Sequence, residues 1–268
     1  MMTEPHFAPV PLQLQRLQQW LGELAGAHRQ PAPEDQEKID LKYAHSQRVF
    51  QEASALCKAL ELPEKQRLPV QAAALVHDCG RFPQYSRYKT FRDPDSVNHA
   101  RLGLRTLREE QPLDTAGFSP AISRDIELAV LLHNRKHLPA WLTPWHHRLC
   151  AIVRDADKLD IFAVILGHLE RDVSEQDPAI TLGLRPDPTR YSSELVAQVQ
   201  AGAQVDYRHL VWVNDFKLLL ASWVPHLVFA ASRHRLRESG LLDRLLASLP
   251  ADPACRSLAA TLRGCSTV

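Results

Sequence analysis

Apolar residues recur every three or four positions along most of this chain. In residues 12–27, for example, Leu14, Leu17, Leu21 and Leu24 fall on one face of a helix. Alternation of apolar and polar residues, which is typical of a half-buried strand, is almost absent. The pattern therefore predicts an all-α chain of about ten helices with no sheet.

Prolines and glycines divide the chain into segments, and each segment with helical periodicity is a predicted helix. We expect helices at residues 12–27, 38–60, 69–79, 95–110, 120–134, 144–170, 192–201, 211–231, 233–249 and 253–263. Gly80 follows the third of these and is expected to end it in the left-handed conformation. The polar, aromatic-rich residues 81–94 are expected to form a loop, and residues 177–188, with three prolines, a linker or excursion.

The composition is that of a soluble globular protein. The 268 residues include 32 Lys and Arg and 31 Asp and Glu, which gives a formal net charge of +1, and 45% of the residues are hydrophobic. Proteins that bind the nucleic-acid backbone or an anionic membrane usually carry a basic excess. We therefore expect neither a nucleic-acid polymer nor a membrane as a partner.

Glycine and cysteine positions exclude further classes. No two of the ten glycines stand two positions apart, so the chain has no dinucleotide-binding fingerprint. The five cysteines are odd in number and form no C-x-x-C pair, which favours a reducing compartment, and we expect a cytoplasmic protein. Residues 1–11 lack the apolar segment of a secretory signal. The apolar stretch 218–231 is interrupted at Pro225 and is too short for a membrane helix, so it is interpreted as a buried, kinked helix.

The candidate functional residues of this sequence are mainly histidines, and one of them is in the dipeptide His77-Asp78. A single buried histidine is more often satisfied by a backbone carbonyl than by a metal. This dipeptide, however, ends a helix that is apolar on all sides, where an unpaired imidazole and an unpaired carboxylate each cost free energy. A bound cation would compensate both groups. Cys79, which follows, is interpreted as a buried structural thiol.

Other histidines and one more aspartate share this placement on apolar helix faces. His45, for instance, lies one turn from Leu41 and one turn from Val49. The candidate ligands are His45, His77, Asp78, His99, His133 and Asp157. Neutral imidazole and carboxylate groups together form a mixed nitrogen and oxygen ligand set that suits Mn, Fe, Co, Ni or Zn.

Two aspartates of the predicted helix 144–170 differ in phase. Asp157 shares a face with Val153 and Ile161, whereas Asp155 is turned away from Asp157 by about 200°. We therefore expect Asp157 to face inward and Asp155 to be solvated.

Five motifs follow one another in a distinctive order. They are His45, Ala-Leu-Val-His77-Asp78-Cys-Gly-Arg-Phe, Val-Asn-His99-Ala-Arg-Leu-Gly, Leu-Leu-His133-Asn-Arg and Arg-Asp-Ala-Asp157-Lys158-Leu-Asp160. In this order they resemble the HD-domain superfamily of metal-dependent phosphohydrolases. The resemblance covers about residues 38–165 and includes six ligand positions.

The resemblance implies an all-helical HD fold and a site for two divalent ions, with Mn, Fe, Co, Ni, Mg and Zn as the candidates. The basic metal set of the superfamily corresponds to His45, His77, Asp78 and Asp157. Asp78 would bridge the ions, and His99 and His133 match the extra ligands of binuclear members. The implied activity is that of a phosphomonoesterase or phosphodiesterase that attacks a small phosphorylated metabolite or nucleotide through a metal-activated bridging water.

The chain departs from the superfamily in two places. Hydrolases related to those of the stringent response carry an acidic residue shortly after the His-Asp pair, and here Gly80-Arg81-Phe82-Pro83-Gln84 follows instead. A glutamate proton shuttle is therefore absent at this position. The chain also lacks a Gly-Tyr-Pro signature, which argues against hydrolysis of cyclic dinucleotides.

Positive charge for a phosphate is expected from Arg81, three residues after Asp78, and from Lys158 beside Asp157. These two residues and Asp78 are the candidate catalytic residues. An ion pair with Asp155 or Asp160 is the alternative for Lys158, and Asp160 is expected to orient a ligand or Lys158. Candidate substrate-binding residues are Arg81, Lys89, Arg92 and Asn134. Residues 85–92 would form a phosphate- and base-binding lid or, alternatively, a solvated basic loop with its aromatic rings turned inward.

Two other functions stay open. The same ligand set resembles the HD-type diiron oxygenases, such as myo-inositol oxygenase and the phosphonate-cleaving enzymes, which would require iron and a small organic or phosphonate substrate. Arg81 stands where those oxygenases typically have lysine, which favours hydrolysis. The third interpretation is an inactive HD domain that binds a nucleotide as a sensor.

Three regions are expected along the chain. Residues 1–37 form an N-terminal helix and a proline-rich connection, residues 38–170 the metal-binding HD core, and residues 171–268 a helical extension. We expect the extension to pack on the same core as part of one domain.

Overall fold

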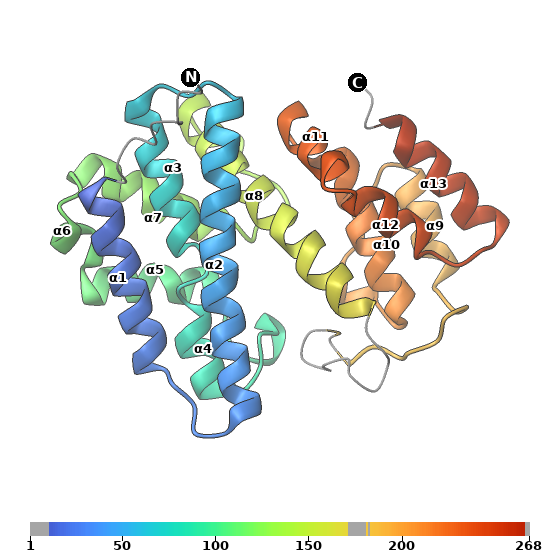
Figure 1. Ribbon diagram of the computed structural model, residues 1–268, viewed down its shortest axis with the longest axis horizontal. Helices are drawn as coiled ribbons and strands as arrows, with labels where there is room; N and C mark the ends of the chain where they lie inside the picture. Colours follow the sequence, from blue (N-terminus) through green and yellow to red (C-terminus); the bar gives the residue numbers. More distant parts are fainter. Residues whose placement is uncertain (1–10, 171–180, 182, 266–268) are drawn as a thin grey trace, which may run out of the picture. The chain divides into compact units, whose positions relative to one another are not determined.

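The computed structural model describes residues 11–170, 181 and 183–265, and it confirms the all-α prediction (Figure 1). Within these residues the regular elements are helices, accompanied by one isolated β-bridge between Arg185 and Trp212. Residues 177–180 and 182 of the expected linker lie outside the described residues, as does the segment before residue 11. No helix of the described part is both long enough and apolar enough to cross a membrane.

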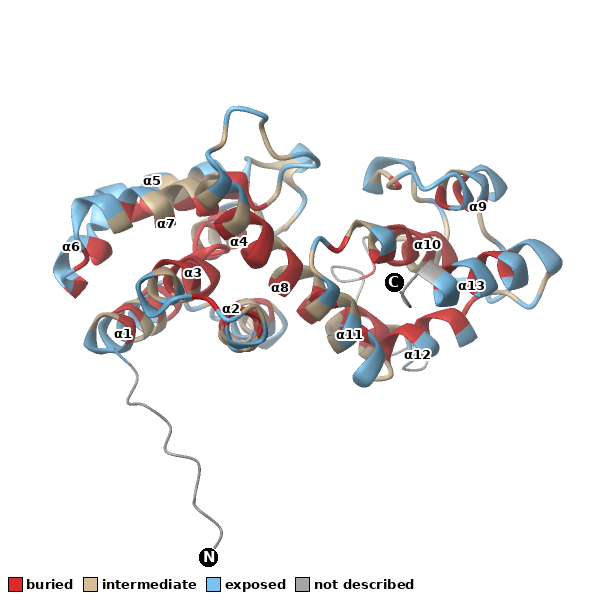
Figure 2. Cartoon of the chain, turned by 90° about the horizontal axis from the view of Figure 1, so that it is seen from above, coloured by how far each residue is buried: buried red, intermediate tan, exposed pale blue. Residues whose placement is uncertain are grey.

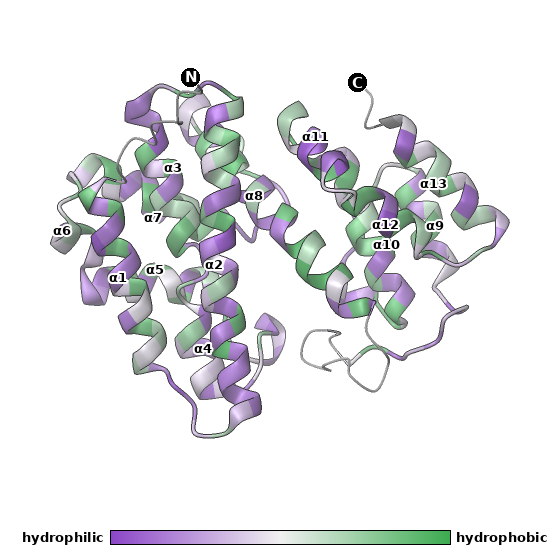
Figure 3. Ribbon diagram, viewed as in Figure 1, coloured by the Kyte–Doolittle hydropathy of each residue, from purple (hydrophilic) through white to green (hydrophobic). Residues whose placement is uncertain are grey.

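The chain divides into two compact units between Arg154 and Asp155, inside the helix α8. The helices of the first unit are α1 (Leu12–Ala27), α2 (Pro33–Ala59), α3 (Glu64–Val76), α4 (Arg81–Tyr88), α5 (His99–Glu110), α6 (Pro112–Ala116), α7 (Pro120–Leu132) and the first part of α8 (Pro144–Leu169). Bands of hydrophilic and hydrophobic residues alternate along α2 (Figure 3), as expected of an amphipathic helix.

Helix α3 lies at the centre of the first unit and packs against α1, α2 and α7. Its second half, from Pro69 to Val76, is almost entirely buried (Figure 2). Pro69 sits inside the helix, whose first turn precedes the proline, so α3 begins five residues earlier than expected. Because this second half of α3 is apolar, α1, α2 and α7 pack against it, and His77 and Asp78, which directly follow the helix, lie in the interior.

The prediction of a loop over residues 81–94 is wrong for the first half of this range, because α4 occupies residues 81–88. Pro83 lies in the first turn, where a missing N–H costs no helical hydrogen bond. Phe82 and Tyr85 of this short helix are buried, and Lys89 ends it in the left-handed conformation with φ 53°. Burial of these aromatic side chains stabilises a helix that the polar sequence alone does not predict.

The backbone conformation of Gly80 also differs from the prediction. Its φ is −67°, so it does not provide a left-handed exit. A Cβ atom added at Gly80 would overlap the backbone of His99 and Gly103, and this close approach is what requires glycine here. The end of α3 and the start of α5 therefore touch through their main chains.

We expect Gly80→Ala to lower the free energy of unfolding by about 3 kcal/mol, because neither backbone neighbour can rotate away. Thermal or urea unfolding measures the loss. Gly26→Ala in α1 is the matched control, since a Cβ there meets nothing within 4 Å, and it is expected to be neutral or stabilising. Equal stability of the two variants would contradict the close approach at Gly80.

The second unit contains the rest of α8 followed by α9 (Ser193–Gln200), α10 (Val213–Trp223), α11 (Ala230–Glu238), α12 (Leu241–Ala247) and α13 (Pro253–Cys265). The predicted helix 211–231 ends early, because Pro225 leads into a 3-10 helix (Val224–His226). The predicted helix 233–249 is two helices separated by Gly240, whose φ of 70° cannot continue a helix.

Candidate metal centre

Four helices of the first unit deliver the candidate ligands through their ends or faces. His45 lies on α2, His77 and Asp78 directly follow α3, His99 is the first residue of α5, and His133 directly follows α7. All five side chains are buried, none more than 6% exposed. The sequence therefore predicted correctly that these polar groups lie in the interior.

His77 and His133 are held by the same local device. In each ring Nδ1 donates to the carbonyl oxygen three residues earlier, at 2.8 Å to Ala74 and at 2.7 Å to Val130. Because a carbonyl only accepts, Nδ1 carries a proton, and Nε2 is the ring nitrogen that is left to bind a metal. Both Nε2 atoms face the interior of the site.

His99 is oriented by a carboxylate instead. Its Nδ1 donates to Asp93, with both carboxylate oxygens at 2.8 Å. Burial, together with the positive charge of Arg81, lowers the pKa of His99 to about 3, although Asp93 opposes this shift. The ring is therefore neutral at physiological pH, and its Nε2 also presents a lone pair.

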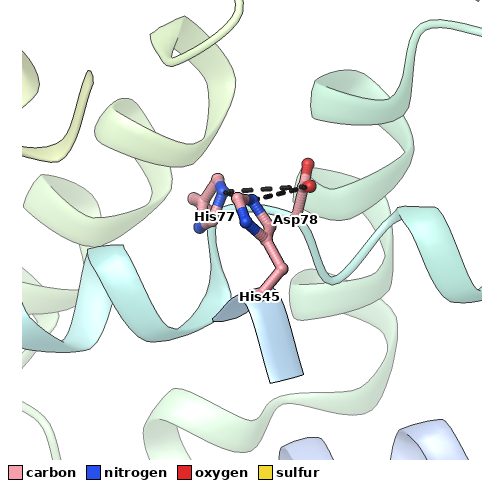
Figure 4. Close-up of side chains that lie close together, drawn as sticks. All are labelled: His45, His77 and Asp78. Carbon is pink, nitrogen blue, oxygen red and sulfur yellow. Dashed lines mark hydrogen bonds and ion pairs between the residues drawn. The ribbon is translucent and has the colours of Figure 1, made fainter. Parts of the chain in front are cut away.

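Asp78 lies between two pairs of histidines. The Nε2 atoms of His45 and His77 are 3.2 Å apart and lie 3.5 and 3.8 Å from Oδ2 of Asp78 (Figure 4). On the other side, the Nε2 atoms of His99 and His133 are 2.9 Å apart, and each is 3.5 Å from Oδ1. Each carboxylate oxygen thus joins two imidazole nitrogens in a group with the spacing of metal ligands.

These residues fit a bound cation, and the pair His99–His133 shows why. Nδ1 of each ring donates to a fixed acceptor, so the two Nε2 atoms, which face each other across 2.9 Å, are the nitrogens left to bind a metal. Oδ1 of Asp78 is buried beside them without a hydrogen-bond partner. A cation bound by these three atoms would satisfy the orphaned oxygen.

Two basic side chains flank the central carboxylate. Lys42 Nζ lies 2.8 Å from Oδ2 and Arg81 Nε lies 3.4 Å from Oδ1 of Asp78. Burial alone would raise the pKa of Asp78, but Lys42 and Arg81 hold it well below its usual range. Asp78 is therefore ionised, as a ligand must be.

Comparison with known families agrees with this geometry. A family model of the HD domain matches residues 43–161, which include all six expected ligand positions. Residues 43–161 are an HD domain. No curated protein and no solved structure matches the chain. The buried histidine and aspartate groups fit the metal site of an HD domain, a domain of the metal-dependent hydrolase superfamily.

Sequence reasoning missed two residues of the HD site, Asp93 and Lys42. Asp93 lies in a 3-10 helix (Asp93–Asp95) and orients His99, and it also accepts from Gln84 Nε2 at 3.0 Å. Lys42 stands three residues before His45 and so shares its helix face. The spacing to His45 was a usable signal for Lys42, whereas no periodicity marks Asp93.

We expect Asp93→Ala to weaken metal binding by roughly 10- to 100-fold, because His99 loses the partner that fixes its tautomer and ring angle. Titration of the metal-free protein with Mn²⁺ measures the change. Asp95→Ala is the matched control, since Asp95 belongs to the same 3-10 helix but pairs with Arg92 at the surface. Unchanged affinity in Asp93→Ala would contradict the orienting role.

The candidate substrate-binding residues fall into two groups. Arg81 and Asn134 lie beside the HD site, where both contact Asp93, at 3.3 Å from Arg81 Nη1 and 3.4 Å from Asn134 Nδ2. Lys89 and Arg92 are half exposed, and each has an acidic partner, Asp35 at 2.6 Å and Asp95 at 3.0 Å. Their binding of substrate stays a prediction.

The sequence analysis made predictions for four residues of α8. Asp157 and Lys158 are half-buried and Asp160 is buried, and their roles as ligand, phosphate-binding residue and orienting residue stay predictions. The expected solvation of Asp155 is wrong, because its side chain is fully buried. Its Oδ2 accepts the backbone N–H groups of Val228 and Phe229 ahead of α11, and burial raises its pKa.

Cys79 is buried beside the ligands, as expected. Burial and the negative charge of Asp78 raise the pKa of its thiol. A thiol with a raised pKa is a poor nucleophile, which agrees with a structural role.

Proposed function

We propose that this protein is a metal-dependent phosphohydrolase that cleaves a phosphomonoester or phosphodiester bond in a small phosphorylated metabolite or nucleotide. The observation that carries the proposal is the symmetric environment of Asp78. Each of its two oxygens lies within 4 Å of two imidazole Nε2 atoms, which is the arrangement expected of a carboxylate shared by two cations.

Two divalent cations would neutralise phosphate oxygens, lower the pKa of a water between them and hold the reacting groups in line. The residues expected to hold them are His45, His77, Asp78, His99, His133 and, on α8, Asp157. Backbone carbonyls and Asp93 hold three of the rings in the tautomer that binds metal, so the site is preorganised before any ion arrives.

Arg81 is expected to bind the phosphate. Gln84 and the carbonyl of Phe91 accept from Nη1, so the guanidinium is held in one position beside the ligands. Its positive charge would attract the substrate and stabilise the charge that develops on the leaving oxygen. Lys158 is the second candidate for this task.

The HD-type diiron oxygenase is the second candidate function, because a ligand set rich in imidazole also suits iron. Elemental analysis of protein purified without added metal distinguishes the two, with a chelator-treated sample as the control. Mn, Co, Ni, Mg or Zn, together with hydrolysis in a panel of phosphomonoesters and phosphodiesters, would support the proposal. Two irons per chain with oxygen uptake and a diiron EPR signal would overturn it, and failure to bind any metal after reconstitution would favour the sensor.

A further inference from the structure

The two cations beside Asp78 differ in how they are held. Arg81 is tied to Gln84, to the carbonyl of Phe91 and to Asp93. Lys42, among the described residues, contacts only Oδ2 of Asp78 at 2.8 Å and the ring of Phe91, whose centre lies 5.4 Å from Nζ. The guanidinium is therefore fixed, whereas the ammonium ends a flexible four-carbon stem and has one hydrogen bond to give up.

Lys42 lies where a divalent cation held by His45 and His77 would also bind. Its ammonium binds Oδ2, the same oxygen that faces the pair His45–His77. An ammonium and a divalent cation at this oxygen repel each other and compete for its lone pairs. The opposite oxygen, Oδ1, has no hydrogen-bond partner and meets Arg81 only at 3.4 Å. The two oxygens of Asp78 therefore differ in their basic partners.

The balance of charges around Asp78 indicates what Lys42 would bind once a metal displaces its ammonium from Oδ2. The positive charges of Lys42 and Arg81 already cancel the negative charges of Asp78 and Asp93. Two divalent ions would leave a large positive excess in a buried site, which an anionic ligand must balance. Lys42 is about 18% exposed, so its ammonium can reach a ligand that enters from solvent.

We propose that Lys42 is an exchangeable counter-cation, which neutralises Asp78 while the His45–His77 side is empty and binds the phosphate of the substrate once a divalent ion displaces it. This inference rests on the proposed function. It makes Lys42 a specificity residue for phosphorylated substrates and a regulator of metal occupancy on one side of the centre.

Titration of the metal-free protein with Mn²⁺ tests the first half without any substrate. Lys42→Met keeps the length of the side chain but removes the charge, and it is expected to tighten one of the two Mn²⁺ affinities about tenfold. Lys58→Met, at an exposed position near the end of the same helix, is the control and is expected to bind Mn²⁺ like the wild type. Equal affinities in Lys42→Met and wild type would overturn the proposal.

Titration of the Mn²⁺-saturated protein with inorganic phosphate tests the second half. Lys42→Met is expected to bind phosphate about tenfold more weakly than the wild type and Lys58→Met. Unchanged phosphate affinity would likewise overturn the proposal. The two proposals can fail separately. If the protein hydrolyses no phosphate ester but Lys42→Met changes both the Mn²⁺ and the phosphate affinity, only the proposed function is wrong. If the protein is an active hydrolase and both affinities are unchanged in Lys42→Met, only the proposed role of Lys42 is wrong.

Discussion

Asp78→Asn is expected to abolish metal binding on both sides of the centre and to reduce hydrolysis to background. The amide has nearly the volume of the carboxylate, so the buried space stays filled, but it lacks the negative charge that a shared ligand supplies. Both histidine pairs lose their common partner, since Oδ1 faces one pair and Oδ2 the other. Elemental analysis after dialysis, with a phosphatase assay on the same sample, measures the effect.

The exposed Asp114 in α6 provides the control for this variant. Asp114→Asn makes the same chemical change at the surface and is expected to keep full metal content and activity. Circular dichroism should show a folded helical protein for both variants. Two ions per chain in Asp78→Asn would show that Asp78 does not hold the metals together.

Replacing either histidine of the pair His99–His133 by alanine is expected to leave about one ion per chain. The Nε2 atoms of these rings lie beside Oδ1 of Asp78, whereas those of His45 and His77 lie beside Oδ2, so the loss of either ring should empty one side and spare the other. Activity should fall by roughly two to three orders of magnitude, because one cation cannot hold both the attacking and the leaving oxygen.

The reciprocal variant makes this test specific. His45→Ala should also leave about one ion, now on the side of His99 and His133, while His147→Ala at an exposed position should keep two. If both His99→Ala and His133→Ala retain two ions per chain, the centre is not binuclear in the way proposed. The metal content of all four variants can be measured in parallel.

The sequence predicted the burial of His45, His77 and Asp78 because a polar residue on an apolar helix face stands out in the sequence pattern. His45 interrupts an apolar face of α2, and His77 and Asp78 follow the buried, apolar second half of α3. The same logic failed for Asp155, because helix phase describes one element only. The residues that enclose Asp155, Val228 and Phe229, lie more than seventy positions later, and no local pattern announces such a partner.

The structure of residues 81–95 was equally hard to predict. Asp93 acquires its role only when η1 (Asp93–Asp95) brings its carboxylate to His99, and α4 forms because Phe82 and Tyr85 find a buried environment. Both depend on tertiary contacts that compensate a weak local preference. The fold class and the burial of the candidate ligands follow from periodicity, whereas the supporting contacts follow from packing.

The contact between Gly80 and the start of α5 has a consequence for how this centre can change. Gly80 stands two residues after Asp78, and its Cα rests against the main chain of His99 and Gly103. The distance from Asp78 to the His99 side is thus set by two backbones in contact, which side-chain substitutions nearby do not alter. We therefore expect side-chain substitutions around the candidate metal centre to leave the separation between Asp78 and His99 unchanged.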